Sequence, residues 1–408
     1  MKNILLIMPY GGVGGMERLA LNFYNQYKKQ GYTVKVMKII QLDSDIFHFR
    51  DDEIALSKLD FIQMSFLKRF WFYCKIPFII YKTVKKNKIT HSIAFGDMAN
   101  LFSSLSFSKE YKVAGIHSFK SIEFKEKNFL NIIFKWAYKT TYCSFDKVVC
   151  ISQAVKQDLI NNCGFKFKNK LQVVYNPHDF KAIDRLSQEP LESILEKELF
   201  HNKVILFLGR LTLVKAPWHL IKSFSLLENH DNSVKLVFIG TGDEQLVEHL
   251  MELSSKLGVK ENVVFLGKKS NPYPYLKSAS LLALTSYYEG TPNVIVEAIA
   301  METPIVSSNC TDGILELMSN EKCEKINTII STECGIITPN FYKGDMKIPL
   351  NESIIAEEKI FSEAINIVLG TDFYISKIKE NKAQLLAKFN LETNASSYIS
   401  KEKKDNNA

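Results

Sequence analysis

The sequence predicts an α/β fold with two domains, each built on a parallel sheet flanked by helices. Short runs such as Ile4–Met8 and Val204–Leu208 are continuously apolar, as is typical of parallel strands buried on both faces. Helical patterns separate these runs, so that strands and helices alternate along the chain. The alternation begins at the N-terminus and begins again after residue 200, which indicates two sheets.

The stretch between the two halves, 184–198, is polar and has no strand pattern. We therefore expect an N-terminal domain over 1–183, a linker over 184–200 and a second domain over 201–365. The remaining residues, 366–408, are expected to form a C-terminal helix that packs back on the N-terminal domain and a charged tail.

The first half opens with a βαβ unit. A glycine-rich loop, Pro9–Arg18, follows the first strand and precedes a helix over 19–27. The loop lacks the third glycine of a dinucleotide fingerprint and has no Walker lysine, so it is either a tight turn or a point of close approach to a ligand. Strands are expected at 4–8, 33–37, 91–95, 111–116, 147–152 and 171–177.

The second half is expected to contain another parallel sheet and a long helical segment over 357–389. Arg210 and Lys215 follow its first strand, and Gly240 follows its second. The carboxyl ends of parallel strands meet at one edge, where open α/β sheets bind ligands. These residues are therefore either binding residues or, for the two cations, an ordinary surface pair. Strands are expected at 204–208, 235–239, 263–267, 280–286, 303–308 and 335–337.

The composition excludes several classes of protein. With 408 residues and 46% hydrophobic content, the chain has room for two or three globular domains. Seven cysteines without a C-x-x-C pair form neither a disulfide framework nor a zinc site, which favours a reducing compartment. The N-terminal apolar run is too short for a signal peptide, and no stretch has eighteen uninterrupted apolar residues, so we expect no transmembrane helix.

Two segments, Phe61–Gly96 and Phe124–Tyr142, combine aromatic side chains with lysine. The first holds seven Lys or Arg and no Asp or Glu, and we expect Pro77 to interrupt its helix. Basic helices rich in Trp and Phe are typical of proteins that lie on an anionic membrane. A solvated charged face above a core face is the alternative, and nucleic acid is not expected as a partner.

Two glutamates, Glu289 and Glu297, frame a turn and an apolar run that follow an expected strand. The turn contains Thr291-Pro292. Proline suits the first turn of a helix because it has no N–H, and an N–H at that position would find no acceptor within the helix. A helix N-terminus also presents N–H groups that bind anions. Taken alone, the pair is typical of a core helix with two solvated carboxylates. The cations at the other strand ends favour a binding site instead.

Jointly these residues resemble the retaining glycosyltransferases of family 4, which have the GT-B fold. The resemblance extends over nearly the whole chain: Gly14–Arg18 is similar to the family's Gly-Gly-x-Glu-Arg loop, and Val149–Ser152 and Tyr175–Pro177 to its strand ends. It implies two Rossmann-like domains that face a central cleft. In the second half it rests on Gly209-Arg210, Lys215, Gly240–Gly242, Glu289 and Glu297.

The resemblance also implies residue roles at a nucleotide-diphosphate-sugar site. Arg210 and Lys215 would hold the phosphates, and Glu289 would contact the sugar hydroxyls. His117, which otherwise fits an ordinary hydrogen-bonded loop histidine, would face the sugar from the N-terminal domain. Glu297 would accept hydrogen bonds from the ribose hydroxyls. The other donor-binding residues would be Gly14, Gly15, Gly209, Gly240, Gly290, Thr291, Pro292 and Asn293.

Some positions depart from the family pattern. Ala216 stands where glycine often follows the lysine, and Asp312-Gly313 replaces paired small residues, so details of these loops differ. Asp43-Ser44-Asp45 resembles a metal-binding D-x-D motif. Because GT-B enzymes hold phosphate on side chains and amides, we interpret this motif as a solvated loop and expect no metal and no cofactor.

The implied activity is transfer of a sugar from a nucleotide-diphosphate donor, expected to be a UDP-sugar, to a glycan acceptor. Together with the basic aromatic segments, it suggests a polyprenyl-diphosphate-linked acceptor in bacterial surface polysaccharide or lipopolysaccharide synthesis. The enzyme would be cytoplasmic and peripheral on the inner face of the cell membrane. Two alternatives remain: a nucleotide-sugar epimerase or soluble sugar synthase, and a non-catalytic subunit that keeps the fold.

Overall fold

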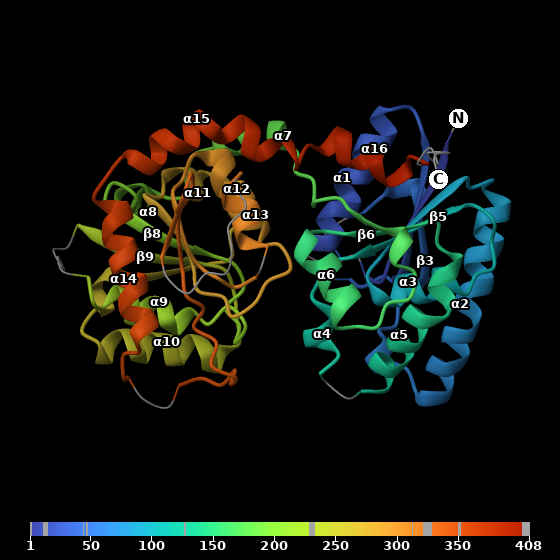
Figure 1. Ribbon diagram of the computed structural model, residues 1–408, viewed down its shortest axis with the longest axis horizontal. Coiled ribbons are helices and arrows are strands. Elements are labelled where there is room, and N and C mark those ends of the chain that lie inside the picture. Colours follow the sequence, from blue (N-terminus) through green and yellow to red (C-terminus); the bar gives the residue numbers. More distant parts are fainter. Residues whose placement is uncertain are drawn as a thin grey trace. The chain divides into compact units, whose positions relative to one another are not determined.

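The computed structural model describes residues 2–10, 15–43, 45, 48–125, 128–227, 233–311, 313–320, 329–349 and 352–401. The chain forms two compact units (Figure 1). Unit 1 contains Met1–Asp179 and Lys388–Ala408, and unit 2 contains Phe180–Ala387. The chain thus leaves unit 1 once and returns to it near its C-terminal end.

Unit 1 is built on a parallel sheet in the order β3-β2-β1-β4-β5-β6-β7. The strands are β1 (Asn3–Met8), β2 (Thr33–Ile40), β3 (Glu53–Ser57), β4 (His91–Phe95), β5 (Tyr111–Ile116), β6 (Lys147–Cys150) and β7 (Leu171–Val173). Sequence reasoning missed β3. This strand lies at the edge of the sheet and is only half-buried, so it lacks the apolar run by which the other strands were recognised.

Helices cover both faces of this sheet (Figure 1). They are α1 (Gly15–Lys29), α2 (Phe66–Lys86), α3 (Asp97–Ser104), α4 (Lys120–Glu123), α5 (Phe129–Lys139), α6 (Gln153–Asn161) and α16 (Leu391–Ile399). Side chains alternate along β1, so that Leu6 packs in a core with α1 and α16, and Ile7 in a core with α2 and α3. This two-sided burial accounts for the continuous apolar runs.

α16 ties the end of the chain to unit 1. The hydroxyl of Tyr27 on α1 donates a 2.7 Å hydrogen bond to the carbonyl of Ala395. The rings of Phe23 and Tyr398 lie 4.7 Å apart, edge to face. Lys147 on β6 donates to the Ser397 carbonyl at 2.7 Å. α16 is therefore held by both apolar and polar contacts.

α2 runs without interruption from Phe66 to Lys86, so the expectation that Pro77 breaks it is wrong. Proline removes one hydrogen bond within a helix. Ile76, Ile80 and Val84 are nevertheless buried against the sheet, and this packing holds both halves of α2 on one axis. No helix within the described ranges is both long and apolar enough to cross a membrane.

Unit 2 has a second sheet, in the order β10-β9-β8-β11-β12-β14-β13. Its strands are β8 (Lys203–Leu208), β9 (Val234–Ile239), β10 (Val263–Gly267), β11 (Leu281–Leu284), β12 (Ile305–Ser308), β13 (Ile330–Thr332) and β14 (Gly335–Thr338). All pairs are parallel except β13 with β14. The expectation of a purely parallel sheet is therefore wrong at this edge, where a short strand turns directly back on its neighbour.

The helices of unit 2 differ from expectation in two places. They are α7 (Phe180–Ser187), α8 (Ile194–Leu199), α9 (Pro217–Phe224), α10 (Glu244–Lys256), α11 (Tyr273–Ser278), α12 (Asn293–Met301), α13 (Ile314–Met318), α14 (Ala356–Leu369) and α15 (Phe373–Ala387). The expected linker, 184–200, contains the second half of α7 and all of α8. The expected long helix, 357–389, is broken after Gly370, and α15 packs against α12 in unit 2 rather than on unit 1.

Candidate functional site

The strand order of unit 2 reverses direction between β8 and β11, which are neighbours in the sheet. From β8 the chain continues to β9 and β10 on one side, and from β11 to β12 and β14 on the other. Such a reversal leaves a crevice at the carboxyl ends of the two strands, where α/β proteins bind ligands. The loops 209–216 and 285–292 begin at this point.

Hydrogen bonds join these two loops to each other. The N–H of Tyr287 donates to the carbonyl of Val214 at 2.8 Å. The Thr285 hydroxyl lies 3.1 Å from the carbonyl of Lys215 and 3.2 Å from that of Ala216. Ala216 has a left-handed backbone, with φ of 43°, which explains why the family prefers glycine here. The two loops therefore lie side by side and are held together by hydrogen bonds.

The loops after β8 and β9 are in close contact at Gly240, and Gly209 and Gly240 both have backbone conformations that favour glycine. Their φ angles are 154° and 148°, and a Cβ added to Gly240 would lie 1.8 Å from the Gly209 carbonyl oxygen. The Gly209 N–H donates to the Ile239 carbonyl at 3.0 Å. A Cβ at Gly209 would lie 3.9 Å from Cε of Lys215. Both glycines thus support the loop that carries Lys215.

Replacing Gly240 by alanine is expected to destabilise unit 2 by about 3 kcal/mol or more, because backbone strain of about 1–3 kcal/mol adds to the overlap with Gly209. Gly258→Ala is the matched control, since Gly258 has φ of 71° but nothing within 4 Å of an added Cβ. It should cost only about 1–2 kcal/mol. Urea unfolding measures both, and equal losses would refute the close-contact explanation.

Lys215 and Glu289 form an ion pair across the two loops. The Glu289 Oε1 atom also accepts a 2.7 Å hydrogen bond from the Ser286 hydroxyl, and the Glu289 N–H donates to the Cys310 carbonyl at 3.0 Å. The side chains of Lys215 and Glu289 are 20% and 15% exposed. The structure therefore brings together two of the predicted site residues, partly shielded but accessible from solvent.

Arg210 lies on the same loop as Lys215 and is exposed. It forms no ion pair with any residue that the structure describes. An arginine that is not neutralised by a carboxylate presents a fork of N–H donors suited to phosphate oxygens. Arg210 is thus available to an anionic ligand at this edge of the sheet.

α12 begins at Asn293, with Pro292 as its N-cap residue. Pro292 therefore lies just before the helix, with extended backbone (φ −70°, ψ 99°). The sequence had placed this proline in the first turn, one residue further into the helix. Gly290 and Thr291 lie half-buried in the loop before it. The N–H groups of the first turn of α12 lie beside the Glu289 loop, as an anion site requires.

Glu297 lies one turn into α12 and is buried, with 6% of its surface exposed. Tyr273 on α11 donates its hydroxyl to Glu297 Oε1 at 3.3 Å. The interpretation as a solvated carboxylate is therefore wrong for Glu297. Sequence reasoning missed Tyr273, because nothing local to α11 indicates that its ring reaches α12.

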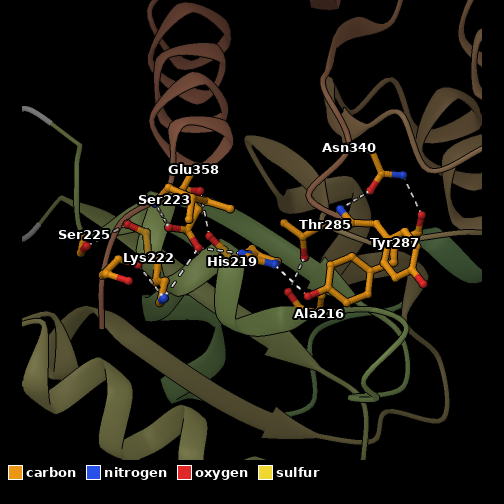
Figure 2. Close-up of polar contacts among 12 residues, drawn as sticks. Ala216, His219, Lys222, Ser223, Ser225, Thr285, Tyr287, Asn340 and Glu358 are labelled. Carbon is orange, nitrogen blue, oxygen red and sulfur yellow. Dashed lines mark hydrogen bonds and ion pairs between the residues drawn. The ribbon is translucent and has the colours of Figure 1, made fainter. Parts of the chain in front are cut away.

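A buried polar network lies beneath the Tyr287 loop (Figure 2). His219 on α9 contacts Glu358 of α14 through Nδ1 at 2.6 Å and the Tyr287 hydroxyl through Nε2 at 3.1 Å. Its ring stacks on Phe341, with centroids 4.5 Å apart. Asn340 donates to the Tyr287 carbonyl at 2.7 Å. The loop is thus fixed from below by groups far apart in the sequence.

Protonation of this network follows from burial. Desolvation lowers the pKa of His219, despite the opposing effect of Glu358, and raises the pKa of Tyr287 to about 12. A neutral His219 with its proton on Nδ1 satisfies all three groups: Nδ1 donates to Glu358, and Nε2 accepts from the Tyr287 hydroxyl. Glu358 is fully buried, so its carboxylate depends on His219 Nδ1 and on the Ile355 N–H, which donates to Oε2 at 2.9 Å.

His117 follows β5 in unit 1. Its Nε2 is buried and has no hydrogen-bond partner among the described residues. A Cβ added to Gly115 would lie 2.5 Å from this atom, so the ring lies directly over the glycine. Burial, followed by the charge of Lys120, lowers the pKa of His117 to about 3. The imidazole is therefore neutral at physiological pH and keeps a buried, unpaired nitrogen.

Three further expectations concern the other loops. Gly15 is the exposed first residue of α1, whereas Gly14 and Asp312 lie outside the described residues. The D-x-D interpretation as a solvated loop is wrong for Asp45, which is buried and pairs with Lys38 at 3.2 Å. A buried lysine needs such a counter-ion. Within the described ranges, no group of three or more metal-ligating side chains is placed to hold a metal ion.

Two protein families match successive parts of the chain. Glycosyltransferase Family 4 matches residues 13–181, and Glycosyl transferases group 1 matches residues 193–332. The chain belongs to the family 4, group 1 glycosyltransferases. The family resemblance seen in the sequence is thereby confirmed.

Curated relatives of this glycosyltransferase come from several organisms. The chain is 26% identical over 400 residues to the GalNAc-α-(1→4)-GalNAc-α-(1→3)-diNAcBac-PP-undecaprenol α-1,4-N-acetyl-D-galactosaminyltransferase of Campylobacter jejuni, covering 95% of this chain and 99% of the relative. It is 23% identical over 323 residues to the lipopolysaccharide 1,6-galactosyltransferase of Salmonella typhimurium, covering 77% and 81%.

Solved structures establish the fold. Anabaena HepE in complex with UDP and glucose matches with a TM-score of 0.71 at 18% identity, over 97% of this chain and 98% of that chain. The lipopolysaccharide outer core galactosyltransferase WaaB matches with a TM-score of 0.66 at 18% identity, over 98% and 99%. The predicted GT-B fold is confirmed.

Proposed function

We propose that this glycosyltransferase transfers a sugar from a UDP-sugar to a glycan acceptor with retention of the anomeric configuration. The pairing of Lys215 with Glu289 at the carboxyl edge of the unit 2 sheet carries this proposal. Arg210 on the same loop adds a cation that is not neutralised. The presence of UDP and glucose in the HepE structure supports the choice of donor.

The diphosphate is the part of the donor that needs these cations. When the bond to the anomeric carbon breaks, negative charge grows on the leaving β-phosphate. Arg210 binds phosphate oxygens with its fork, Lys215 contributes a point charge, and the first turn of α12 contributes N–H donors. Lys215, held by Glu289, and the N–H groups of α12 are already in place before the reaction, so they stabilise the transition state without reorganising.

Glu289 and Glu297 bind different parts of the donor. Glu289 and the turn from Gly290 to Asn293 contact the sugar hydroxyls. Glu297, oriented by the Tyr273 hydroxyl at 3.3 Å, accepts hydrogen bonds from the ribose hydroxyls. Substitutions at Glu289 or in the turn from Gly290 to Asn293 should therefore change which sugar is transferred. Substitutions at Glu297 should change the affinity for every donor that contains a ribonucleotide.

Retention proceeds by front-face attack of the acceptor hydroxyl, assisted by the leaving phosphate. This route needs no side-chain base, and we assign none. His117 contributes the neutral imidazole of the N-terminal domain, whose unpaired Nε2 binds a sugar hydroxyl. The role of His117 rests on the family resemblance together with the orphaned nitrogen.

The acceptor is a glycan carried on polyprenyl diphosphate, and the enzyme works on the inner face of the cell membrane. The name of the Campylobacter jejuni relative includes a PP-undecaprenol acceptor, which supports this assignment. The cations of α2 and the aromatic side chains of α2 and α5 support attachment to an anionic surface, each cation adding about 1 kcal/mol.

A panel of radiolabelled nucleotide sugars tests the proposal. We expect protein-dependent hydrolysis of one UDP-sugar without acceptor, and transfer to a polyprenyl-diphosphate glycan with the product anomer matching the donor in its NMR coupling constants. Inversion would overturn the mechanism. Isomerised nucleotide sugar without transfer would favour an epimerase, transfer to a free sugar would favour a soluble synthase, and binding without turnover would favour a non-catalytic subunit.

A further inference from the structure

An apolar groove in unit 1 is lined by residues on and next to α2, α3 and α5. Figure 1 shows these three helices in unit 1. Its volume is about 1120 Å³, at or above the upper end of the range of about 300–1,000 Å³ for small-molecule sites. The lining on α2 extends from Phe66 to Tyr81, roughly 22 Å at 1.5 Å per residue. The groove is therefore elongated as well as large.

The walls of the groove are hydrocarbon and aromatic. They include Phe70 and Phe78 from α2, Leu105 after α3, and Ile133 and Trp136 from α5. Phe78 is 71% exposed and Trp136 is 52% exposed. Monomeric soluble proteins rarely expose a continuous apolar surface of this kind unless it binds something.

The charges around the groove are positive. Arg69 lines it and forms no ion pair with the described residues. Among the described residues that line the groove, Arg69 is the one charged side chain, and no carboxylate is present. The charge complementarity favours an occupant with an apolar chain and an anionic head.

We propose that this groove binds the isoprenoid chain of a prenyl diphosphate, with Arg69 toward the diphosphate. The proposal deepens the proposed function, on which it rests for the identity of the acceptor. A flat bilayer would contact only the rim and leave the apolar interior unfilled, whereas an extended chain fills it and displaces water from the aromatic walls. Substrate recognition would then include the lipid as well as the glycan.

Geranylgeranyl diphosphate, in solution and without a sugar donor, tests the proposal through tryptophan emission. The chain has three tryptophans: Trp136 lines the groove, Trp218 is fully buried in unit 2 and Trp71 is 62% exposed. In a Trp71→Phe variant, Trp136 is the exposed reporter. We expect a saturable blue shift of emission with one ligand per chain, and no shift with inorganic diphosphate or in a Trp71→Phe, Trp136→Phe variant.

Cysteine modification locates the bound chain. Cys74 lines the groove, whereas Cys143 is exposed outside it. Geranylgeranyl diphosphate should slow the alkylation of Cys74 at least tenfold and leave Cys143 unchanged. Conversely, a bulky maleimide on Cys74 should weaken prenyl binding at least tenfold, and Cys74→Ser should bind normally and resist this inhibition.

The remaining outcomes separate the alternatives. If phosphatidylglycerol vesicles shift the Trp136 emission but geranylgeranyl diphosphate does not, the groove face contacts a bilayer and the proposal is wrong. Saturable prenyl binding without protection of Cys74 places the chain elsewhere and also overturns it. Protection of Cys74 in a protein that hydrolyses no nucleotide sugar would retain this inference while the proposed transferase function fails.

Discussion

Replacing Arg210 or Lys215 by alanine should lower kcat/KM for sugar transfer by at least about 10²–10³-fold, the usual effect of removing one preorganised donor from a developing oxyanion. Stability should barely change. Arg210 is exposed, and the Lys215–Glu289 pair is partly accessible to solvent, so each loss should stay within about 1 kcal/mol of unfolding free energy. Initial rates and urea unfolding of the same preparations measure the two effects.

Two further variants sharpen this test. Arg210→Lys keeps the charge without the fork and should recover only part of the activity. Lys256→Ala removes a lysine from an exposed ion pair with Glu352, and it should change neither rate nor stability. If alanine at 210 and 215 reduced stability and activity in parallel, these residues would hold the fold and the assignment of a phosphate site would fail.

Removing His219 should produce a large loss of stability, about 3 kcal/mol for His219→Leu. The substitution leaves the Glu358 carboxylate fully buried, with Lys222 3.9 Å away as the nearest remaining cation. Breaking one partner of a buried charged contact costs more than replacing both partners by apolar groups. Tyr287 also loses a hydrogen bond, so KM for the donor should rise because the loop before Glu289 loosens.

A double-mutant cycle isolates this interaction. Glu358→Leu combined with His219→Leu should recover part of the lost stability, giving a coupling free energy of at least about 1 kcal/mol. The measurement is urea unfolding of the four proteins. Strictly additive losses would mean that the 2.6 Å contact between His219 and Glu358 contributes nothing specific to the fold.

Patterns local to the chain were sufficient to predict most of the fold. β1 and β8 were recognised because both faces of their sheets are covered, which makes every residue after the first apolar in each strand. β3, at an edge, had no such pattern. Pro77 illustrates the opposite failure: the local rule for proline is sound, but burial of Ile76 and Ile80 against the sheet outweighs it.

The site was predictable to the extent that position along a strand determines position in space. Arg210 and Glu289 follow neighbouring strands, and the structure places their loops together. Tyr273 and the pair His219–Glu358 were missed, since their contacts join α11 to α12 and α9 to α14. No local pattern encodes such long-range contacts, and only the packing of the helices reveals them.

Hydrogen–deuterium exchange with and without the UDP-sugar donor tests most directly whether the loops of unit 2 hold the nucleotide sugar. We predict slower exchange of backbone amides in 209–216, in 240–242 and in 289–297, and no such protection in the Arg210→Ala variant at the same donor concentration. Donor binding that leaves all three segments unprotected, or that protects them equally in the variant, would contradict the proposed site.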